Sequence, residues 1–371
     1  GLGDVYKRQV FAPTRQAASE TFIRANLAGL PFRIQAWFGD ERPLVQPLRC
    51  LYGSAILLSK LLTRLRLLRL AGLPAAWVAW LLIRLDPPDV VLAEFGFEAV
   101  RVMEACRWSG VPLVVHFRGS DASARNRIGL LEERYRRLLR LAGGVIVKSE
   151  RMALRLEELG AERQRIQISP SGANPALFHG SQPCQSPPLL LAVGRFVAKK
   201  GPLLTLRAFQ LCLQRADVSP LPQLWMVGEG PLLAEARRFV VQHQLQNHVV
   251  FAGVCSQEQV AERMRQVRAF VQHSIVAPDG DSEGSPVAVM EAQLSGLPVI
   301  ATRHAGIPDV VVDGATGLLV EEGDVDAMAQ AMLTLLAEPM LAQKLGEAGQ
   351  RRALQHFTVE HHLSLIHISE P

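Results

Sequence analysis

The sequence has few cysteines, and they follow no pattern. The five cysteines are an odd number, lie far apart and form no C-x-x-C pair. Because zinc sites and disulfide frameworks need clustered or paired cysteines, the sequence supports neither. Scattered thiols are typical of a cytoplasmic protein in which they stay reduced. They are Cys50, Cys106, Cys184, Cys212 and Cys255.

Long apolar runs, internal repeats and low-complexity segments are also missing. The segment from Leu57 to Leu85 is basic and apolar, but its longest uncharged run, Leu70 to Ile83, has 14 residues. A helix needs about 20 to cross a bilayer. Two interpretations stay open, namely a helical region that lies on an anionic membrane or an amphipathic helix pair that covers a sheet. The basic residues are Lys60, Arg64, Arg66, Arg69 and Arg84.

Charge is unevenly distributed along the chain. Residues 10–180 carry 24 Lys/Arg against 15 Asp/Glu, or +9, whereas residues 181–362 carry 14 against 18, or −4. A basic half is compatible with nucleic-acid binding, but the sequence has no zinc finger, recognition helix or aromatic-basic sheet motif. We therefore expect no nucleic-acid partner. Solvated surfaces, together with binding to an anionic acceptor or an anionic membrane, explain the positive charge of residues 10–180.

The two ends of the chain mirror each other at the level of codons. Residues 1–9 can be encoded by a DNA string whose reverse complement encodes residues 363–371. Such a string resembles a transposon-type sequencing adapter that was read through in both directions. We therefore set both ends apart from the fold and expect the native part to run from about Val10 to His362. The first strand is then expected to be clipped shortly before Val10.

The length and pattern indicate two α/β domains. About 350 residues suffice for two cores, and the polar, proline-rich segment 179–188 is the expected boundary. On both sides of it, short apolar runs alternate with helix-period segments, which predicts parallel sheets covered on both faces. We expect domains at residues 10–180 and 181–345, followed by a helix at 346–362 that packs back toward the first domain.

Two glutamates stand eight positions apart around an expected helix start. Ser285 suits the N-cap and Pro286 the first helical position, so Glu283 should precede the helix and Glu291 lie on its second turn. Free backbone N–H groups between them form an anion site. A nucleotide-sugar matches this layout, with its diphosphate on the helix start and its ribose and sugar hydroxyls on the two carboxylates. No metal is needed for this.

Four further blocks accompany the two-glutamate motif. They are residues 194–201, 227–231, 251–253 and 314–320. In this order the five blocks resemble the donor site of the GT4 family of retaining glycosyltransferases, in particular the branch that builds bacterial exopolysaccharides and surface glycans. The resemblance covers most of the chain. It implies the GT-B architecture, two Rossmann-like domains that face a central cleft, with ligands at the carboxyl ends of the strands.

The resemblance also implies roles for single residues. Glu283 would position the donor sugar and Glu291 the ribose. Arg195 and Lys200, a planar fork and a point charge, would hold the diphosphate together with the amides of the helix start. The glycines of Gly228-Glu-Gly-Pro231 would allow backbone to approach the ligand. The expected donor-binding residues are Arg195, Lys200, Val254, Gly284, Ser285, Pro286, Val287 and Glu291.

Asp279-Gly-Asp281 has the D-x-D spacing that binds metal in another glycosyltransferase fold. Asp324-Val-Asp326 has the same spacing, so the match is not specific. Because the first pair lies in a glycine-rich loop ahead of the expected helix, we favour a structural or sugar-facing role. We expect neither a metal nor a cofactor besides the nucleotide-sugar.

In the first domain the resemblance is imperfect. Related enzymes often carry Phe-His-Gly-x-Asp after the third readable strand, with the histidine beside the reacting sugar, whereas this chain has Arg118 there and His116 two places earlier. Since residues two apart on a strand share a face, His116 is an active-site group, a buried strand histidine or neither. Arg118 can hold a phosphate or an anionic acceptor. Ala18 to Phe22 resembles the acceptor-side segment, or is ordinary helix capping.

These observations predict a metal-independent, retaining glycosyltransferase. It would move a hexose-type residue from a nucleoside-diphosphate sugar to a glycan or lipid-linked acceptor, in the cytoplasm or peripherally at the inner membrane face. Glu283, Arg118 and His116 are the expected catalytic residues. Two alternatives stay open: a nucleotide-sugar epimerase of GT-B architecture, and a non-catalytic glycan-binding protein on the same scaffold.

Overall fold

The computed structural model describes residues 7–14, 33–39 and 47–368. The chain divides into two compact units, Gly1–Ser169 with Leu363–Pro371, and Pro170–His362. Residues 170–180, which the sequence analysis assigns to the first domain, therefore belong to the second unit. The segment from Ala18 to Phe22 lies outside the described residues.

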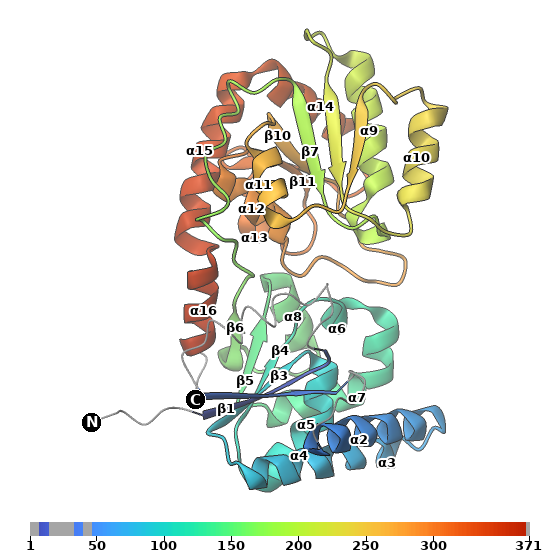
Figure 1. Cartoon of the computed structure of the whole chain (residues 1–371), viewed down its shortest axis with the longest axis vertical. Coiled ribbons are helices and arrows are strands. Elements are labelled where there is room, and N and C mark those ends of the chain that lie inside the picture. The colour runs from blue at the N-terminus through green and yellow to red at the C-terminus, as the bar shows by residue number, and fades with distance from the viewer. Residues whose placement is uncertain (1–6, 15–32, 40–46, 369–371) are drawn as a thin grey trace, which may run out of the picture. The chain divides into compact units, whose positions relative to one another are not determined.

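The first unit is built on a parallel sheet (Figure 1). Its described strands lie in the order β2-β1-β3-β4-β5-β6. The strands are β1 (Lys7–Ala12), β2 (Arg33–Phe38), β3 (Val90–Glu94), β4 (Leu113–His116), β5 (Gly144–Val147) and β6 (Ile166–Ile168). Glu94 pairs in register with His116, so the polar residues that end these strands meet at one edge. β1 starts inside the segment 1–9 and buries Gln9, whose side-chain amide donates to the carbonyl of Asp86.

Alternate residues of these strands face opposite sides of the sheet, as the two-residue period of a strand requires. Phe11, Val91 and Val115 pack into the large core with the helices, whereas Val10 and Val114 face the other way and are also buried. Burial on both faces explains the continuous apolar strands. The helices are α2 (Pro47–Arg64), α3 (Leu68–Ala71), α4 (Leu73–Leu85), α5 (Gly96–Ser109), α6 (Ser120–Ser123), α7 (Arg125–Leu141) and α8 (Glu150–Glu158).

Helices α2 and α4 bury one face and expose an unusually apolar one. Tyr52 and Ile56 of α2 pack in the core with Ala79 and Leu82 of α4. The pair is thus an amphipathic cover, yet large apolar side chains on α2, on α4 and on the short segment between them remain at least 45% exposed. These are Leu57, Leu58, Leu61, Leu65, Leu67, Leu70, Leu73, Trp77 and Leu85. Within the described residues, no helix combines the length and apolarity needed to cross a membrane.

The second unit repeats the architecture with a different strand order, β12-β11-β10-β7-β8-β9. The chain runs outward from β7 through β8 to β9, then returns to place β10 on the other side of β7. In such sheets ligands bind where the order reverses, beyond the carboxyl ends of the two central strands. Here that point lies between β7 and β10. The strands are β7 (Leu189–Val193), β8 (Gln223–Val227), β9 (Val249–Gly253), β10 (Ala269–Gln272), β11 (Val299–Thr302) and β12 (Gly317–Val320).

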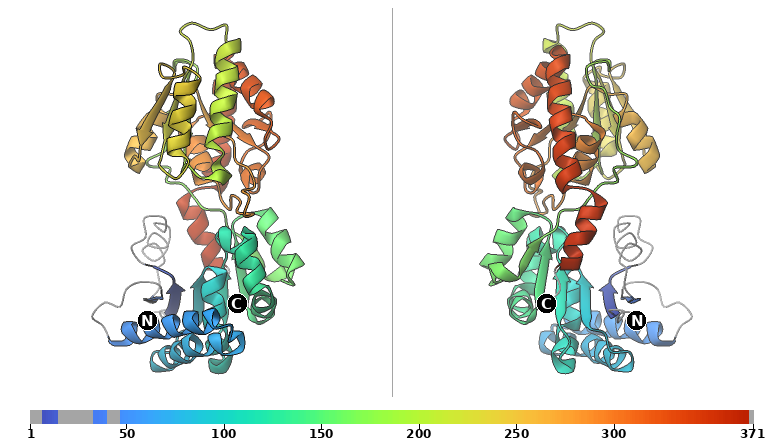
Figure 2. Two further views of the ribbon diagram at one scale, coloured as in Figure 1. Left: turned by 90° about the vertical axis from the view of Figure 1, so that its right-hand side faces the viewer. Right: turned by 90° about the vertical axis from the view of Figure 1, so that its left-hand side faces the viewer.

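Helices cover both faces of the second sheet (Figure 2). One face packs against α9 (Pro202–Arg215), α10 (Leu233–Gln242) and α14 (Val325–Ala337). The other packs against α11 (Gln257–Met264), α12 (Val287–Ser295), α13 (Ile307–Val310) and α15 (Pro339–His356). The final helix, α16 (Val359–Ile368), crosses the division between the units.

Candidate active site

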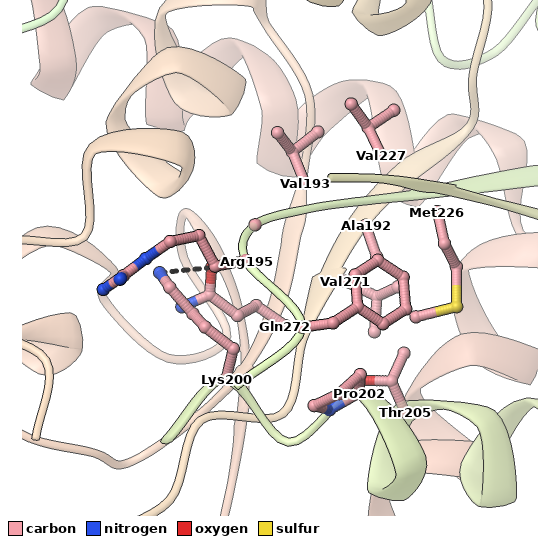
Figure 3. A pocket seen from close by; sticks show the side chains of 12 residues that line it. Ala192, Val193, Arg195, Lys200, Pro202, Thr205, Met226, Val227, Val271 and Gln272 are labelled. Atoms are coloured by element: carbon pink, nitrogen blue, oxygen red, sulfur yellow. Dashed lines mark hydrogen bonds between the residues drawn. The ribbon is translucent and has the colours of Figure 1, made fainter. Parts of the chain in front are cut away.

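A small pocket opens at the strand-order reversal of the second unit (Figure 3). Its lining comes from the ends of β7, β8 and β10, the loop after β7 and the start of α9. Arg195 and Lys200 extend in the same direction from that loop, and the Lys200 ammonium donates to the side-chain oxygen of Gln272 at 3.4 Å. Arg195 is exposed and makes no ion pair with another described residue. Two cations therefore stand together where the fold predicts a ligand.

Glu283 is held by one of these cations. Its Oε2 lies 2.7 Å from the Lys200 Nζ, although the two residues are far apart in sequence. Burial alone would raise the pKa of Glu283, but Lys200 and Lys199 lower it below the ordinary value. Glu283 is thus an ionised, almost buried carboxylate at neutral pH. Sequence reasoning placed both residues at the site, and the structure brings them into contact.

The D-x-D aspartates shape the loop that leads to Glu283. Asp281 Oδ2 lies 3.0 Å from the Lys199 Nζ, and Asp279 Oδ1 accepts the backbone N–H of Asp281. Lys199 also donates to the carbonyl of Ser282. In the part of the chain that the structure describes, no group of three or more His, Cys, Asp or Glu side chains is arranged to hold a metal ion.

The start of α12 differs from its prediction. The helix begins at Val287 with Pro286 in the N-cap position, so the predicted Ser285 cap is wrong. The Ser285 hydroxyl instead accepts the backbone N–H of Ser171, a tertiary contact that outweighs the local preference. Pro286 has no N–H to offer, and that of Val287 donates to the carbonyl of Ser285. Of the residues from Gly284 to Val287 that were predicted to bind an anion, Gly284 and Ser285 keep an available amide.

Glu291 lies on the second turn of α12, as predicted, in a very different electrostatic state from Glu283. Burial raises its pKa to about 8, with Lys200 acting in the opposite direction. Glu291 therefore carries a proton at neutral pH when no ligand is bound. At neutral pH Glu283 is therefore ionised and Glu291 is protonated, although the two residues are only eight positions apart.

The glycines of the loop after β8 pack against backbone. A Cβ on Gly228 would lie 2.1 Å from the carbonyl oxygen of Gly194, and one on Gly230 would lie 2.6 Å from that of Phe196. They let this loop pack against the one that carries Arg195, and the ligand approach expected from sequence stays a prediction. Val254, which follows the left-handed Gly253, is 70% exposed.

The first unit has its own polar cluster at the strand ends. Arg118 donates through Nε and Nη2 to Glu94 Oε2, at 2.8 and 2.7 Å. His116 ends β4 as a fully buried strand histidine, with Nδ1 3.4 Å from the same oxygen. Lys148, just after β5, donates to the carbonyl of Ser169. Burial and the nearby Arg118 lower the pKa of Lys148 well below its ordinary value, with Glu94 opposing them.

Asp121 joins the two loops that carry this cluster. Its carboxylate accepts the backbone N–H groups of Gly96, Arg118 and Gly119. Burial nevertheless raises its pKa, because desolvation outweighs these bonds. The aspartate of the sequence motif therefore sets the backbone path on which Arg118 is presented.

Two family models match the chain in tandem. The "Glycosyl transferase 4-like domain" matches residues 10–172, and "Glycosyl transferases group 1" matches residues 177–352. The chain belongs to the GT4-type glycosyltransferases. This confirms the resemblance that the five sequence blocks indicated.

Named relatives of this GT4-type chain lie among exopolysaccharide glycosyltransferases. The putative colanic acid biosynthesis glycosyltransferase WcaL of Escherichia coli K12 is 32% identical over 250 residues, covering 66% of this chain and 60% of WcaL. The amylovoran biosynthesis glycosyltransferase AmsK of Erwinia amylovora is 29% identical over 252 residues, covering 67% and 61%. The match thus spans about three fifths of the length of these relatives.

A solved structure with the same fold covers nearly the whole chain. Anabaena Alr3699/HepE in complex with UDP aligns with a TM-score of 0.74, covering 98% of this chain and 99% of that one. At 16% sequence identity the likeness shows the fold alone. It confirms the predicted GT-B class.

Sequence reasoning missed several members of the polar clusters in the two units of this GT4-type chain. Glu94, Lys148, His304 and Glu322 were not singled out, although each ends or closely follows a strand. Polar residues at the carboxyl ends of parallel strands are candidates wherever they occur. That rule would have found them, but it could not have said which of them touch.

Proposed function

We propose that this chain transfers a sugar from a nucleoside-diphosphate sugar to a glycan or lipid-linked acceptor, with retention of configuration at the anomeric carbon. The observation that carries the proposal is the Lys200–Glu283 ion pair beside Arg195, at the strand-order reversal of the second unit. An ionised carboxylate at the edge of a cationic pocket suits a ligand that is anionic at one end and rich in hydroxyls at the other.

The cations serve the departing nucleotide. In the proposed step an acceptor hydroxyl oxygen bonds to the anomeric carbon, the bond from that carbon to the diphosphate oxygen breaks, and the acceptor proton leaves on the released diphosphate. Arg195 and Lys200, with the amides of Gly284 and Ser285, stabilise the charge that grows on the diphosphate. Because these hydrogen-bond donors are already in place before the reaction, they stabilise the transition state without first having to reorganise.

The two glutamates divide the remaining contacts. Glu283, ionised and held by Lys200, accepts hydrogen bonds from hydroxyls of the transferred sugar. Glu291, buried on α12, accepts from the ribose hydroxyls and loses its proton when they bind. Val254 supplies backbone for the base. In the first unit, Arg118 and His116 serve the acceptor and the reacting sugar.

The relatives' names support the class of acceptor. WcaL and AmsK are named for colanic acid and amylovoran biosynthesis, so a growing exopolysaccharide intermediate is the proposed acceptor. The HepE structure holds UDP, which makes uridine the first donor base to test.

We further propose that the apolar outer face of α2 to α4 rests on an anionic membrane. Its exposed leucines and Trp77 can enter the lipid interface, while Lys60, Arg64, Arg66 and Arg84 meet acidic headgroups. No acidic residue interrupts the segment from Leu57 to Leu85. A peripheral membrane position would suit a lipid-linked acceptor.

A nucleotide-sugar screen tests the function. Thermal shifts with uridine and guanosine diphosphate sugars should single out one donor, since a ligand at a hundred times its dissociation constant adds about 2.7 kcal/mol. Product analysis with that donor should show transfer or hydrolysis, and activity should survive EDTA. An isomerised donor would instead indicate an epimerase. Binding of the donor without turnover would indicate a glycan-binding scaffold. Strict dependence on a divalent ion would restore Asp279 and Asp281 as metal ligands.

A further inference from the structure

His304 links the two-glutamate loop to the end of the sheet. It follows β11 closely and is fully buried. Its Nε2 accepts the backbone N–H of Glu283 at 3.0 Å, and its Nδ1 lies 2.6 Å from Glu322 Oε1. Because a backbone N–H can only donate, Nε2 bears no proton and Nδ1 must carry it. The imidazole is therefore neutral, in a single tautomer, with both nitrogens engaged.

Glu322 extends this link to the loop after β10. Its second oxygen, Oε2, accepts the backbone N–H of Val276 at 2.9 Å. The next residue, Gly323, donates its N–H to His273 Nε2 at 3.0 Å. The loop that follows β12 is thus bonded to the segment His273–Glu283 at its start and, through His304, at its end.

Glu283 is consequently held at two points. Lys200 holds the carboxylate, whereas His304 holds the main chain from which that side chain projects. In the first contact, the Glu283 carboxylate binds the Lys200 ammonium, which the diphosphate of a bound donor also attracts. The second involves no atom that a ligand needs, so it persists when the donor enters.

We infer that His304 and Glu322 are positioning residues that fix the backbone of Glu283 so that its carboxylate meets the donor sugar. This inference rests on the proposed function, because it assigns to Glu283 the sugar rather than the nucleotide. It follows that losing the link weakens turnover of the intact donor far more than the affinity for the free nucleoside diphosphate, which does not meet the Glu283 carboxylate.

Two substitutions of similar size separate the halves of the link. The side-chain oxygen of His304→Gln reaches the position of Nε2 and can still accept the Glu283 N–H. The side-chain amide of His304→Asn reaches only the position of Nδ1 and can still bond Glu322. Since the Glu322 side chain is 30% exposed, water can replace a partner lost there. Nothing comparable is open to the buried Glu283 amide.

The experiment measures kcat and KM for the nucleotide-sugar that the unmodified chain turns over, calorimetric affinity for the matching free UDP or GDP, and the melting temperature. His304→Asn should lower kcat about a hundredfold, the cost of a misplacement near 1 Å, with a much smaller loss of free-nucleotide affinity. His304→Gln should restore most of the turnover. Equal losses in the two variants, or a parallel loss of free-nucleotide affinity, would overturn the inference.

A second variant covers the case in which His304→Asn does not fold. Glu322→Ala removes the acceptor that orients the imidazole from its more exposed side, so it should lower kcat much more than nucleotide affinity. An unchanged kcat would overturn the inference. If the unmodified chain turns over no nucleotide-sugar, the proposed function itself fails. If the unmodified chain is active and His304→Asn is equally active, only the positioning role fails.

Discussion

Each unit places an ion pair at the carboxyl ends of its own parallel sheet, but the two pairs differ in their accessibility to solvent. In the second unit the Lys200 and Glu283 side chains are 16% and 10% exposed, and Arg195 beside them is open to solvent. In the first unit those of Arg118 and Glu94 are 5% and 1% exposed. An accessible pair can exchange one partner for a ligand. A buried pair must first compensate the desolvation of its own charges.

The largest expected effect lies in the accessible pair. Lys200→Ala should lower turnover about 10²- to 10³-fold, the usual cost of removing one preorganised donor to developing charge. The melting temperature should fall less than in Arg118→Ala, because the Glu283 side chain is more exposed than that of Glu94 and Lys199 remains near it. Steady-state kinetics beside melting curves measure both. A variant with unchanged turnover would remove Lys200 from the site.

The buried pair should respond in stability. Arg118→Ala leaves the Glu94 carboxylate buried without its main partner, which should cost about 3–5 kcal/mol of unfolding free energy. Arg118→Lys should restore little, since an ammonium cannot reproduce two N–H groups directed at one oxygen. Urea unfolding of these variants checks this.

A double variant distinguishes the two roles of Arg118. Arg118→Met combined with Glu94→Gln removes both charges, so stability should recover in large part while turnover stays low if Arg118 also binds acceptor or phosphate. Should Arg118→Ala stay folded and fully stable yet lose turnover, the contrast between the two units would break.

The opposite charge states of Glu283 and Glu291 predict a pH dependence. Because burial raises the pKa of Glu291 to about 8 from 4.5, the folded chain binds a proton that the unfolded chain has lost. Its contribution to stability therefore falls as pH rises from 4.5 to 8. Nucleotide affinity should rise over the same range, with proton release on binding. Calorimetry in two buffers measures that release.

Glu291 variants supply the control for this titration. Glu291→Gln cannot titrate and should abolish the proton release, while Glu291→Ala should weaken nucleotide binding by about 1.5–3 kcal/mol, the value of a hydrogen bond to a charged group. Unchanged affinity in Glu291→Ala would exclude a contact with the ribose.

The smallest expected effect concerns the apolar face of the first unit, which has no counterpart in our proposal for the second. The chain should float with anionic vesicles of phosphatidylglycerol and not with neutral ones of phosphatidylcholine. High salt should release it, since screening shortens to about 3 Å at 1 M. Arg64→Gln should weaken the free energy of binding to anionic vesicles by about 1 kcal/mol. Arg351→Gln, at an exposed arginine of the second unit, is the matched control, and equal behaviour on both lipids would leave these helices as solvated surface.

The sequence alone determined the elements and the family of this chain. Apolar runs such as Leu189 to Val193 alternate with helix-period segments, and that local pattern encodes strands and helices whatever their neighbours. The spacing of Glu283 and Glu291 and the order of the five blocks are equally local, so the donor motif could be read before the fold was known.

Only the tertiary structure decided which of these residues meet. The return of the chain to place β10 beside β7 brings Glu283 to Lys200, and the end of β11 brings His304 between Glu283 and Glu322. The opposite pKa shifts of Glu283 and Glu291 have the same origin. Burial and charges on residues distant in the sequence set these pKa shifts, and the residues adjacent to each glutamate in the sequence encode neither.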